Sequence, residues 1–237
     1  MLVRGFPAAA FDTNCYVVAA GEGADCVVVD PGIGVEEPLD ALLRAHDLNP
    51  VAVLLTHGHL DHTFSVTPVC GARGIPAYVH PADDVLLTDP MRGLSAQSAQ
   101  MFGGRLQWTR PSDVALLDPE VPLEVAGLRV STDWAPGHTP GSVMFRLPGD
   151  EAGGEAAAPV LFSGDVLFAG SIGRTDLPGG SWEQMQRSLA GAVLPLPDDT
   201  VVLPGHGPAT TIGRERAGNP FLQGLAGSPV PPPSRGL

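Results

Sequence analysis

The sequence has no lysine, and its 13 basic residues, all arginine, are outnumbered by 26 aspartates and glutamates. The formal net charge is therefore −13 at pH 7. A surface of that sign repels the phosphate backbone of DNA or RNA. The composition thus argues against nucleic acid as a partner.

Cysteines and long hydrophobic runs are also scarce. The three cysteines, Cys15, Cys26 and Cys70, form no CxxC pair, which argues against a zinc ribbon or a disulfide framework. No apolar run approaches the roughly 18 residues of a membrane helix, and the N-terminus lacks the features of a signal peptide. We expect reduced core cysteines, no membrane partner and a cytoplasmic location, while the oligomeric state stays open.

The length of 237 residues is enough for one large domain with a substantial core. We expect this domain over residues 1–225, followed by a proline-rich, disordered tail at 226–237. The segment GDEAGGEAAAP, rich in glycine and alanine, reads as a flexible hairpin connection. Hydrophobic residues make up 43% and charged residues 16%, as in soluble globular proteins.

Short apolar runs bounded by turn residues predict two successive sets of strands. The predicted strands are Leu2–Phe6, Cys15–Ala19, Cys26–Val29, Val51–Leu55, a strand ending at Val79, Val114–Leu117, Val121–Val125, Leu128–Thr132, Val143–Leu147, Val160–Phe162 and Val201–Leu203. Predicted helices cover Glu36–His46, about 63–72, a stretch after Pro81, and about 182–193. This pattern suggests two sheets packed together and covered by helices on the outside.

Residues 88–110 are polar, contain glycine and lack clear periodicity. A long irregular stretch within a compact domain is often a lid or a binding loop. The alternative is a surface excursion pinned by scattered apolar side chains such as Met91, Leu94, Met101, Phe102 and Trp108. The sequence favours neither alternative.

The hexapeptide His57-Gly58-His59-Leu60-Asp61-His62 follows directly after an apolar strand. Residues two apart on an extended chain point to the same side, so His57 and His59 can bind one ion. The turn that follows allows Asp61 and His62 to face a neighbouring position. Imidazole and carboxylate ligands together suit zinc, iron or manganese.

Three further segments place one ligand-type side chain each on a glycine-containing turn after a predicted strand. They are Pro-Gly-His138-Thr-Pro-Gly, Ser-Gly-Asp165 and Leu-Pro-Gly-His206-Gly. Each segment alone is a weak signal. The hexapeptide and these three segments, in this order, are highly specific and predict loops that converge on one edge of the sheets.

This order of motifs resembles the metallo-β-lactamase superfamily, and Asp30 in the VVDPG turn supports the resemblance. The resemblance implies an α+β fold, a four-layer αββα sandwich, with two divalent metal ions, zinc first and iron or manganese as alternatives. It implies that His57, His59 and His138 bind one metal. It also implies that Asp61, His62 and His206 bind the second metal, with Asp165 bridging both.

The segments FAGSIGRTDLPGG and LPGHGPATTIGRERAGNPFLQ are similar to small glyoxalase II-like enzymes, the hydroxyacylglutathione hydrolase group. The likeness extends to about Leu225. It implies hydrolysis of a small-molecule acyl-thiol, such as a 2-hydroxyacyl-thiol, by a metal-bound hydroxide, with Asp61 and Asp165 as catalytic carboxylates. Full-length glyoxalase II has a further C-terminal helical domain and lysines that hold glutathione, so the thiol carrier stays open.

Arg174, in the loop after Asp165, is the candidate for binding a substrate carboxylate, because its planar fork suits that role. An ion pair with Asp176 that pins the loop is an equally good interpretation. Rival functions are a persulfide dioxygenase with one iron on His57, His138 and Asp165, a lactonase, and a non-catalytic binding module. A β-lactamase is disfavoured because no export signal is evident.

Overall fold

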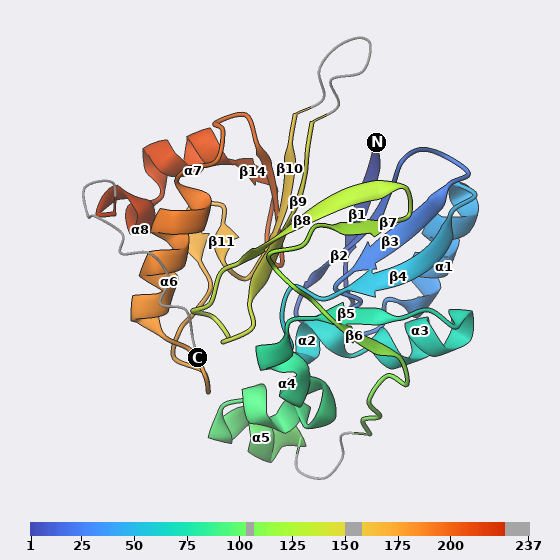
Figure 1. Cartoon of the computed structure of the whole chain (residues 1–237). Coiled ribbons are helices and arrows are strands. Elements are labelled where there is room, and N and C mark those ends of the chain that lie inside the picture. The colour runs from blue at the N-terminus through green and yellow to red at the C-terminus, as the bar shows by residue number, and fades with distance from the viewer. Residues whose placement is uncertain (103–106, 150–157, 226–237) are drawn as a thin grey trace.

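The computed structural model describes residues 1–102, 107–149 and 158–225. Two six-stranded sheets lie face to face, and helices cover both outer faces (Figure 1). This arrangement confirms the predicted four-layer αββα sandwich. Most of the predicted hairpin connection (150–157) and the whole predicted tail (226–237) lie outside the described residues.

The first sheet has the strand order β1-β2-β3-β4-β5-β6. The pairs β1–β2 and β2–β3 are antiparallel, whereas β3–β4, β4–β5 and β5–β6 are parallel. The strands are β1 Leu2–Pro7, β2 Asn14–Ala19, β3 Asp25–Val29, β4 Asn49–Leu54, β5 Ala77–Val79 and β6 Val114–Leu116. The parallel strands β3, β4 and β5 all end at the same edge of this sheet, which becomes the edge of the site.

The second sheet has the order β14-β13-β10-β9-β8-β7, in which only β10 and β13 pair in parallel among the paired strands described. Its strands are β7 Leu123–Val125, β8 Leu128–Trp134, β9 Val143–Leu147, β10 Val160–Gly164, β13 Val201–Pro204 and β14 Thr210–Thr211. A small hairpin of β11 (Leu167–Phe168) and β12 (Ser171–Ile172) follows β10.

Helices cover the outer faces because the strands present apolar side chains there. Helices α1 (Glu36–Ala45) and α3 (Val66–Arg73) lie on the first sheet, and α6 (Trp182–Ser188), the π-turn Leu189–Val193, α7 (Ile212–Gly218) and α8 (Pro220–Gln223) lie on the second. Helix α3 ends at Gly74, whose φ of 64° suits glycine. The short elements α2 Leu60–Thr63, η1 Pro81–Asp83, α4 Asp84–Thr88, η2 Pro90–Gly93 and α5 Ala96–Phe102 lie near the sheet edge.

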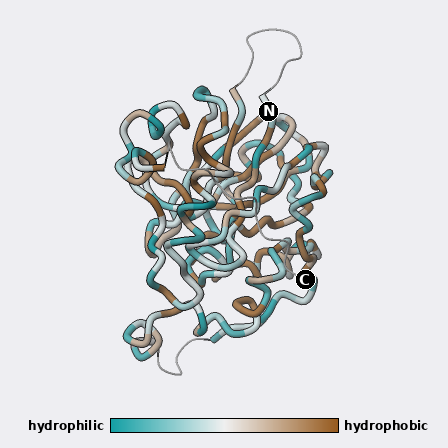
Figure 2. Tube along the Cα trace, turned by 60° about the vertical axis from the view of Figure 1, so that its left-hand side comes forward, coloured by the Kyte–Doolittle hydropathy of each residue, from teal (hydrophilic) through white to brown (hydrophobic). Residues whose placement is uncertain are grey.

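Alternation along the strands builds three apolar layers. In β2, Val17 packs toward the helices of its own sheet and Val18 packs toward the other sheet. In β10, Leu161 faces the outer helices and Phe162 faces the inner layer. Hydrophobic stretches of the trace accordingly run through the interior in Figure 2. The period of two explains why the predicted strands lie close to the observed ones.

Some predictions need correction. Residues 90–102 are not irregular, because they form η2 and α5. The predicted helix at about 63–72 corresponds to α3, while the short α2 before it and the elements β11, β12, β14, α7 and α8 were not predicted. The strands β11, β12 and β14 and the helix α8 have only two to four residues, too few for a periodicity to stand out in a sequence. Helix α7 has seven residues, but its sequence IGRERAG contains one large apolar residue, Ile212, so it shows no apolar stripe either.

The three cysteines are buried and free, as predicted. No helix in the described ranges is long and apolar enough to cross a membrane.

Candidate metal centre

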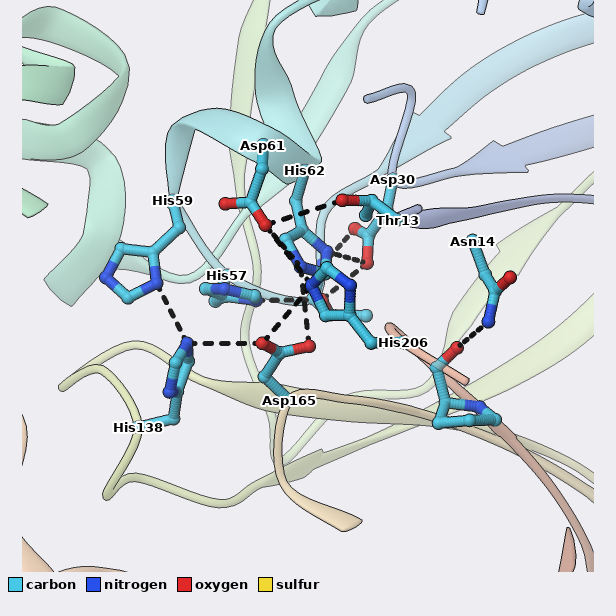
Figure 3. A network of polar contacts seen from close by, with 12 residues as sticks. Thr13, Asn14, Asp30, His57, His59, Asp61, His62, His138, Asp165 and His206 are labelled. Carbon is cyan, nitrogen blue, oxygen red and sulfur yellow. Dashed lines mark hydrogen bonds and ion pairs between the residues drawn. The ribbon is translucent and has the colours of Figure 1, made fainter. Parts of the chain in front are cut away.

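The seven ligand-type side chains come from four loops at one edge of the sandwich (Figure 3). His57 and His59 follow β4, and Asp61 and His62 lie on α2. The other three are His138 between β8 and β9, Asp165 after β10, and His206 after β13. The structure therefore brings together all seven side chains that the sequence singled out.

His57, His59 and His138 form one possible ligand group, with ring nitrogens within 4.8 Å of one another. His59 Nδ1 lies 2.8 Å from His138 Nε2. All three rings are buried. Two or three imidazoles that converge in this way are a common ligand set for zinc or iron.

Asp61, His62 and His206 form a second possible group, with ligand atoms within 4.8 Å of one another. Asp61 Oδ2 lies 3.6 Å from His62 Nε2 and 3.2 Å from His206 Nε2. Asp165 connects the two groups, because its Oδ2 is 3.5 Å from His138 Nε2 and its Oδ1 is 3.3 Å from His62 Nε2. Figure 3 shows this carboxylate between the two sets of imidazoles.

The donor atoms fit a pair of divalent cations. Among the residues that the structure describes, His57 Nε2, His62 Nε2 and Asp165 Oδ1 are buried and have no partner in hydrogen-bond geometry, although the last two lie 3.3 Å apart. Leaving such groups unsatisfied is costly, so a cluster of them requires another partner. A metal ion that accepts lone pairs from nitrogen and carboxylate oxygen satisfies all three.

The pKa shifts differ between the histidines of the two groups. Burial, reinforced by the neighbouring histidines, lowers the pKa of His57, and burial together with His138 lowers that of His59 to about 3. Burial would raise the pKa of Asp165, but His62 outweighs it and the pKa is lowered. His57 and His59 are therefore neutral and ready to bind a metal. Burial would lower the pKa of His62 and His206, but Asp165 and Asp61 outweigh it and raise both, so a metal ion that binds these two rings would displace protons.

Asp30 and Thr56 orient two of the histidines from behind. Asp30 Oδ2 lies 3.0 Å from His62 Nδ1 and accepts a hydrogen bond from Thr56 Oγ1 at 2.6 Å. Thr56 Oγ1 also lies 3.1 Å from His57 Nδ1. Such partners fix the ring orientation and the tautomer of a ligand histidine.

Backbone carbonyls orient two more, His138 and His206. His138 Nδ1 donates to the carbonyl of Arg174 at 2.7 Å, and His206 Nδ1 to that of Phe11 at 3.1 Å. Both bonds leave Nε2 directed at the carboxylates. Gly205 is needed beside the cluster, because a Cβ there would lie 2.6 Å from His62 Cε1.

Asp83 links two of the ligand loops from beneath the site. Its carboxylate is fully buried and accepts hydrogen bonds from Gly58 N at 2.8 Å and Thr139 Oγ1 at 2.6 Å, both on Oδ2. Its Oδ1 accepts from Gly141 N at 2.7 Å. Gly58 lies between His57 and His59, and Thr139 follows His138. Asp83 therefore fixes these two loops relative to each other.

The site forms the floor of a cavity of about 520 Å³. His59, Asp61, His138, Asp165 and His206 contribute the polar floor. The remaining lining residues are mainly apolar: Phe11, Ile33, Leu60, Leu94, Phe168, Ile172 and Leu177, with Ser95, Ser98, Ser171 and Arg174. An apolar cavity above a few convergent polar groups is typical of a small-molecule site.

The segment 88–110 has features of both alternatives, a binding loop and a surface excursion pinned by apolar side chains. Leu94, Ser95 and Ser98 line the cavity, whereas Trp108 donates from Nε1 to the carbonyl of Leu87 at 2.8 Å and packs against the core of the first sheet. The side chains of Met101 and Phe102 lie outside the described residues.

Arg174 lines the cavity, but its guanidinium is also engaged by Asp176. Arg174 Nε and Nη2 lie 2.7 and 2.8 Å from the two carboxylate oxygens. These hydrogen bonds lower the pKa of the exposed Asp176 to about 2. The loop-pinning ion pair thus exists, and the substrate role stays a prediction.

Sequence reasoning missed Asp83 and found Asp30. Both follow a strand of the first sheet, but the stretch after Pro81 was predicted only as a helix. His80 caps the start of this helical stretch, because its Nδ1 accepts a hydrogen bond from Ala82 N at 3.2 Å. The position after a parallel strand, where the other site residues lie, was the available signal.

Relatives cover nearly the whole chain. It is 47% identical over 227 residues to an uncharacterised protein of Mycobacterium tuberculosis, and the matched region covers 95% of this chain and 100% of that protein. It is 35% identical over 223 residues to the hydroxyacylglutathione hydrolase GloC of Haemophilus influenzae, covering 94% and 98% of the two chains.

Solved structures show the same fold. The BLEG-1 B3 metallo-β-lactamase superposes with a TM-score of 0.81 at 40% identity, covering 94% of this chain and 100% of that one. TTHA1623 in a di-iron-bound form gives 0.74 at 39% identity, covering 92% and 100%. The model of the metallo-β-lactamase superfamily matches residues 8–206. With this match over most of its length, the chain belongs to the metallo-β-lactamase superfamily.

Proposed function

We propose that this protein is a metal-dependent hydrolase of thioesters, such as 2-hydroxyacyl-thiols. The observation that carries the proposal is the complete set of seven ligand-type side chains, five of which form the floor of a mainly apolar cavity. The likeness to GloC over almost the whole length of both chains supports the thioester as substrate class.

His57, His59 and His138 would hold one divalent cation and Asp61, His62 and His206 the other, with Asp165 between them. Such a pair, when bound, polarises a carbonyl and activates water near neutral pH. The metal identity is open, and the di-iron form of TTHA1623 makes iron as reasonable as zinc.

The chain's own residues would orient the reactants. The pKa of Asp61 is lowered, since His62 and His206 outweigh the opposing effect of burial, so its carboxylate stays ionised. Asp61 Oδ2 is engaged by His206 and, at 3.4 Å, by Thr13 Oγ1. Asp61 is only partly buried at the cavity floor and would accept a hydrogen bond from the attacking water.

Thiol release from S-D-lactoylglutathione by protein reconstituted with zinc, iron or manganese tests the proposal. We expect saturable release that depends on the metal and is lost in His57→Ala. Oxygen uptake with glutathione persulfide tests the dioxygenase alternative, and nitrocefin tests the activity that the name of BLEG-1 suggests. The proposal would be overturned if metal-replete protein turned over glutathione persulfide or nitrocefin but released no thiol from S-D-lactoylglutathione.

We also propose that Arg174 binds a carboxylate of the thiol carrier. Its ion pair with Asp176 is exposed, and such pairs are worth only about 0–1 kcal/mol, so a substrate carboxylate can compete for the guanidinium. We expect Arg174→Ala to raise the KM for S-D-lactoylglutathione by roughly fivefold, the equivalent of about 1 kcal/mol.

The matched substrate is the S-D-lactoyl thioester of N-acetylcysteamine, which has no carboxylate. Its KM should not change in Arg174→Ala. An equal rise for both substrates would mean that Arg174 only pins the loop through Asp176.

A further inference from the structure

The cavity has two chemically different ends, on opposite sides of the ligand cluster. Arg174 lies at the His138 end, where its carbonyl accepts from the imidazole. Phe11 and Phe168 lie at the His206 end. The Phe11 carbonyl lies 3.1 Å from His206 Nδ1. The Phe168 ring packs edge-on against the His206 ring, with the two ring centroids 6.1 Å apart. In Figure 3, His138 and His206 stand on either side of Asp165.

Phe11 is held at the cavity in a conformation that a phenylalanine rarely adopts. Its φ is 63° and that of Asp12 is 52°, in the left-handed region that favours glycine or asparagine. Its side chain is 62% exposed although it lines the cavity. An apolar ring that lines a cavity and is this exposed is available to contact a ligand there.

The surrounding hydrogen bonds fix the Phe11 loop. Ala8 N donates to Thr13 O at 2.7 Å, and Asn14 N donates to Gly205 O at 2.7 Å. Thr13 also forms a β-bridge with His206. The loop is thus joined to the same segment that supplies a metal ligand.

Phe168 is fixed from the opposite side, through the β11–β12 hairpin. Glu215 is 2% exposed and accepts a hydrogen bond from Gly170 N at 2.7 Å. Asn219 donates from Nδ2 to Ser171 O at 3.0 Å and to Glu215 at 2.9 Å. The RERAGNP motif, which the metal site does not use, therefore holds the hairpin that carries Phe168 in place.

We infer that Phe11 and Phe168 form a binding site for a bulky apolar acyl group, while the thiol carrier lies toward Arg174. This inference rests on the proposed thioester hydrolysis. Contacts with an acyl group are retained while its carbonyl reacts, so the preference acts on kcat/KM. A larger apolar acyl group fills more of this end of the cavity than a methyl group does.

The test compares S-D-mandeloylglutathione with S-D-lactoylglutathione, which differ only by phenyl in place of methyl on the 2-hydroxyacyl group. We expect the metal-reconstituted protein to prefer the mandeloyl thioester by at least about tenfold in kcat/KM. Phe11→Ala and Phe168→Ala should each bring the ratio toward one. Phe221→Ala, which removes a 39%-exposed phenylalanine on α8, should leave the ratio unchanged.

The outcomes separate the two proposals. Hydrolysis of the lactoyl thioester at an equal or higher kcat/KM overturns the acyl site and leaves thioester hydrolysis intact. A mandeloyl preference that survives both phenylalanine substitutions overturns the assignment to Phe11 and Phe168. Hydrolysis of neither compound by metal-replete protein ends the thioester proposal, and the acyl site with it.

Discussion

Replacing Asp165 with asparagine should lower the metal content from two ions per chain to one or none. It should also reduce thioester hydrolysis by on the order of 10³-fold. The carboxylate lies within 3.3–3.7 Å of nitrogens on His62, His138 and His206, so it reaches both ligand groups. The amide keeps the shape but loses the negative charge and one lone-pair oxygen. Metal content by elemental analysis and thiol release under metal-saturating conditions measure the two effects.

The matched control is Asp113→Asn, which changes an exposed carboxylate near β6. It should retain both metals and full activity. Two metals per chain with wild-type turnover in Asp165→Asn would show that Asp165 does not bridge the groups. The other six side chains would then have to hold both metals without a bridging carboxylate.

Most of the fold could be predicted from the sequence, because strand residues alternate between two apolar layers. Val51–Leu55 and Val160–Phe162 are continuous apolar runs, as expected of strands buried on both faces. The β11–β12 hairpin could not be predicted, since each strand has only two residues. Its position depends on Glu215 and Asn219, some 45 residues away in the chain.

The candidate ligands could be predicted as a set because each lies on a turn directly after a strand. Their partners could not be predicted as easily. Arg174 and Phe11 orient His138 and His206 through backbone carbonyls, which any residue type provides. The Arg174–Asp176 ion pair is the exception, since the two residues are only two positions apart and the pair was predicted as one interpretation of Arg174.

Asp83 contributes to the site through buried hydrogen bonds alone, and Asp83→Asn should separate its effect on metal binding from its effect on stability. The amide turns one acceptor into a donor that faces the donors Gly58 N and Thr139 Oγ1, or Gly141 N. We expect a loss of about 1–3 kcal/mol in the free energy of unfolding. We also expect metal affinity about 10- to 100-fold weaker, the usual cost of removing a partner behind a ligand.

Glu215→Gln is the matched control, because it changes a buried, hydrogen-bonded carboxylate that does not contact the loops of the metal ligands His57, His59 and His138. Glu215 is as deeply buried as Asp83 and also accepts three hydrogen bonds, from Gly170 N, Thr210 Oγ1 and Asn219 Nδ2. Both variants should lower Tm by a similar amount in the metal-free protein. Only Asp83→Asn should lose metal in a chelator competition well below Tm, because only Asp83 joins the loops of His57–His59 and His138. Equal metal affinities in the two variants would reduce Asp83 to a purely structural residue.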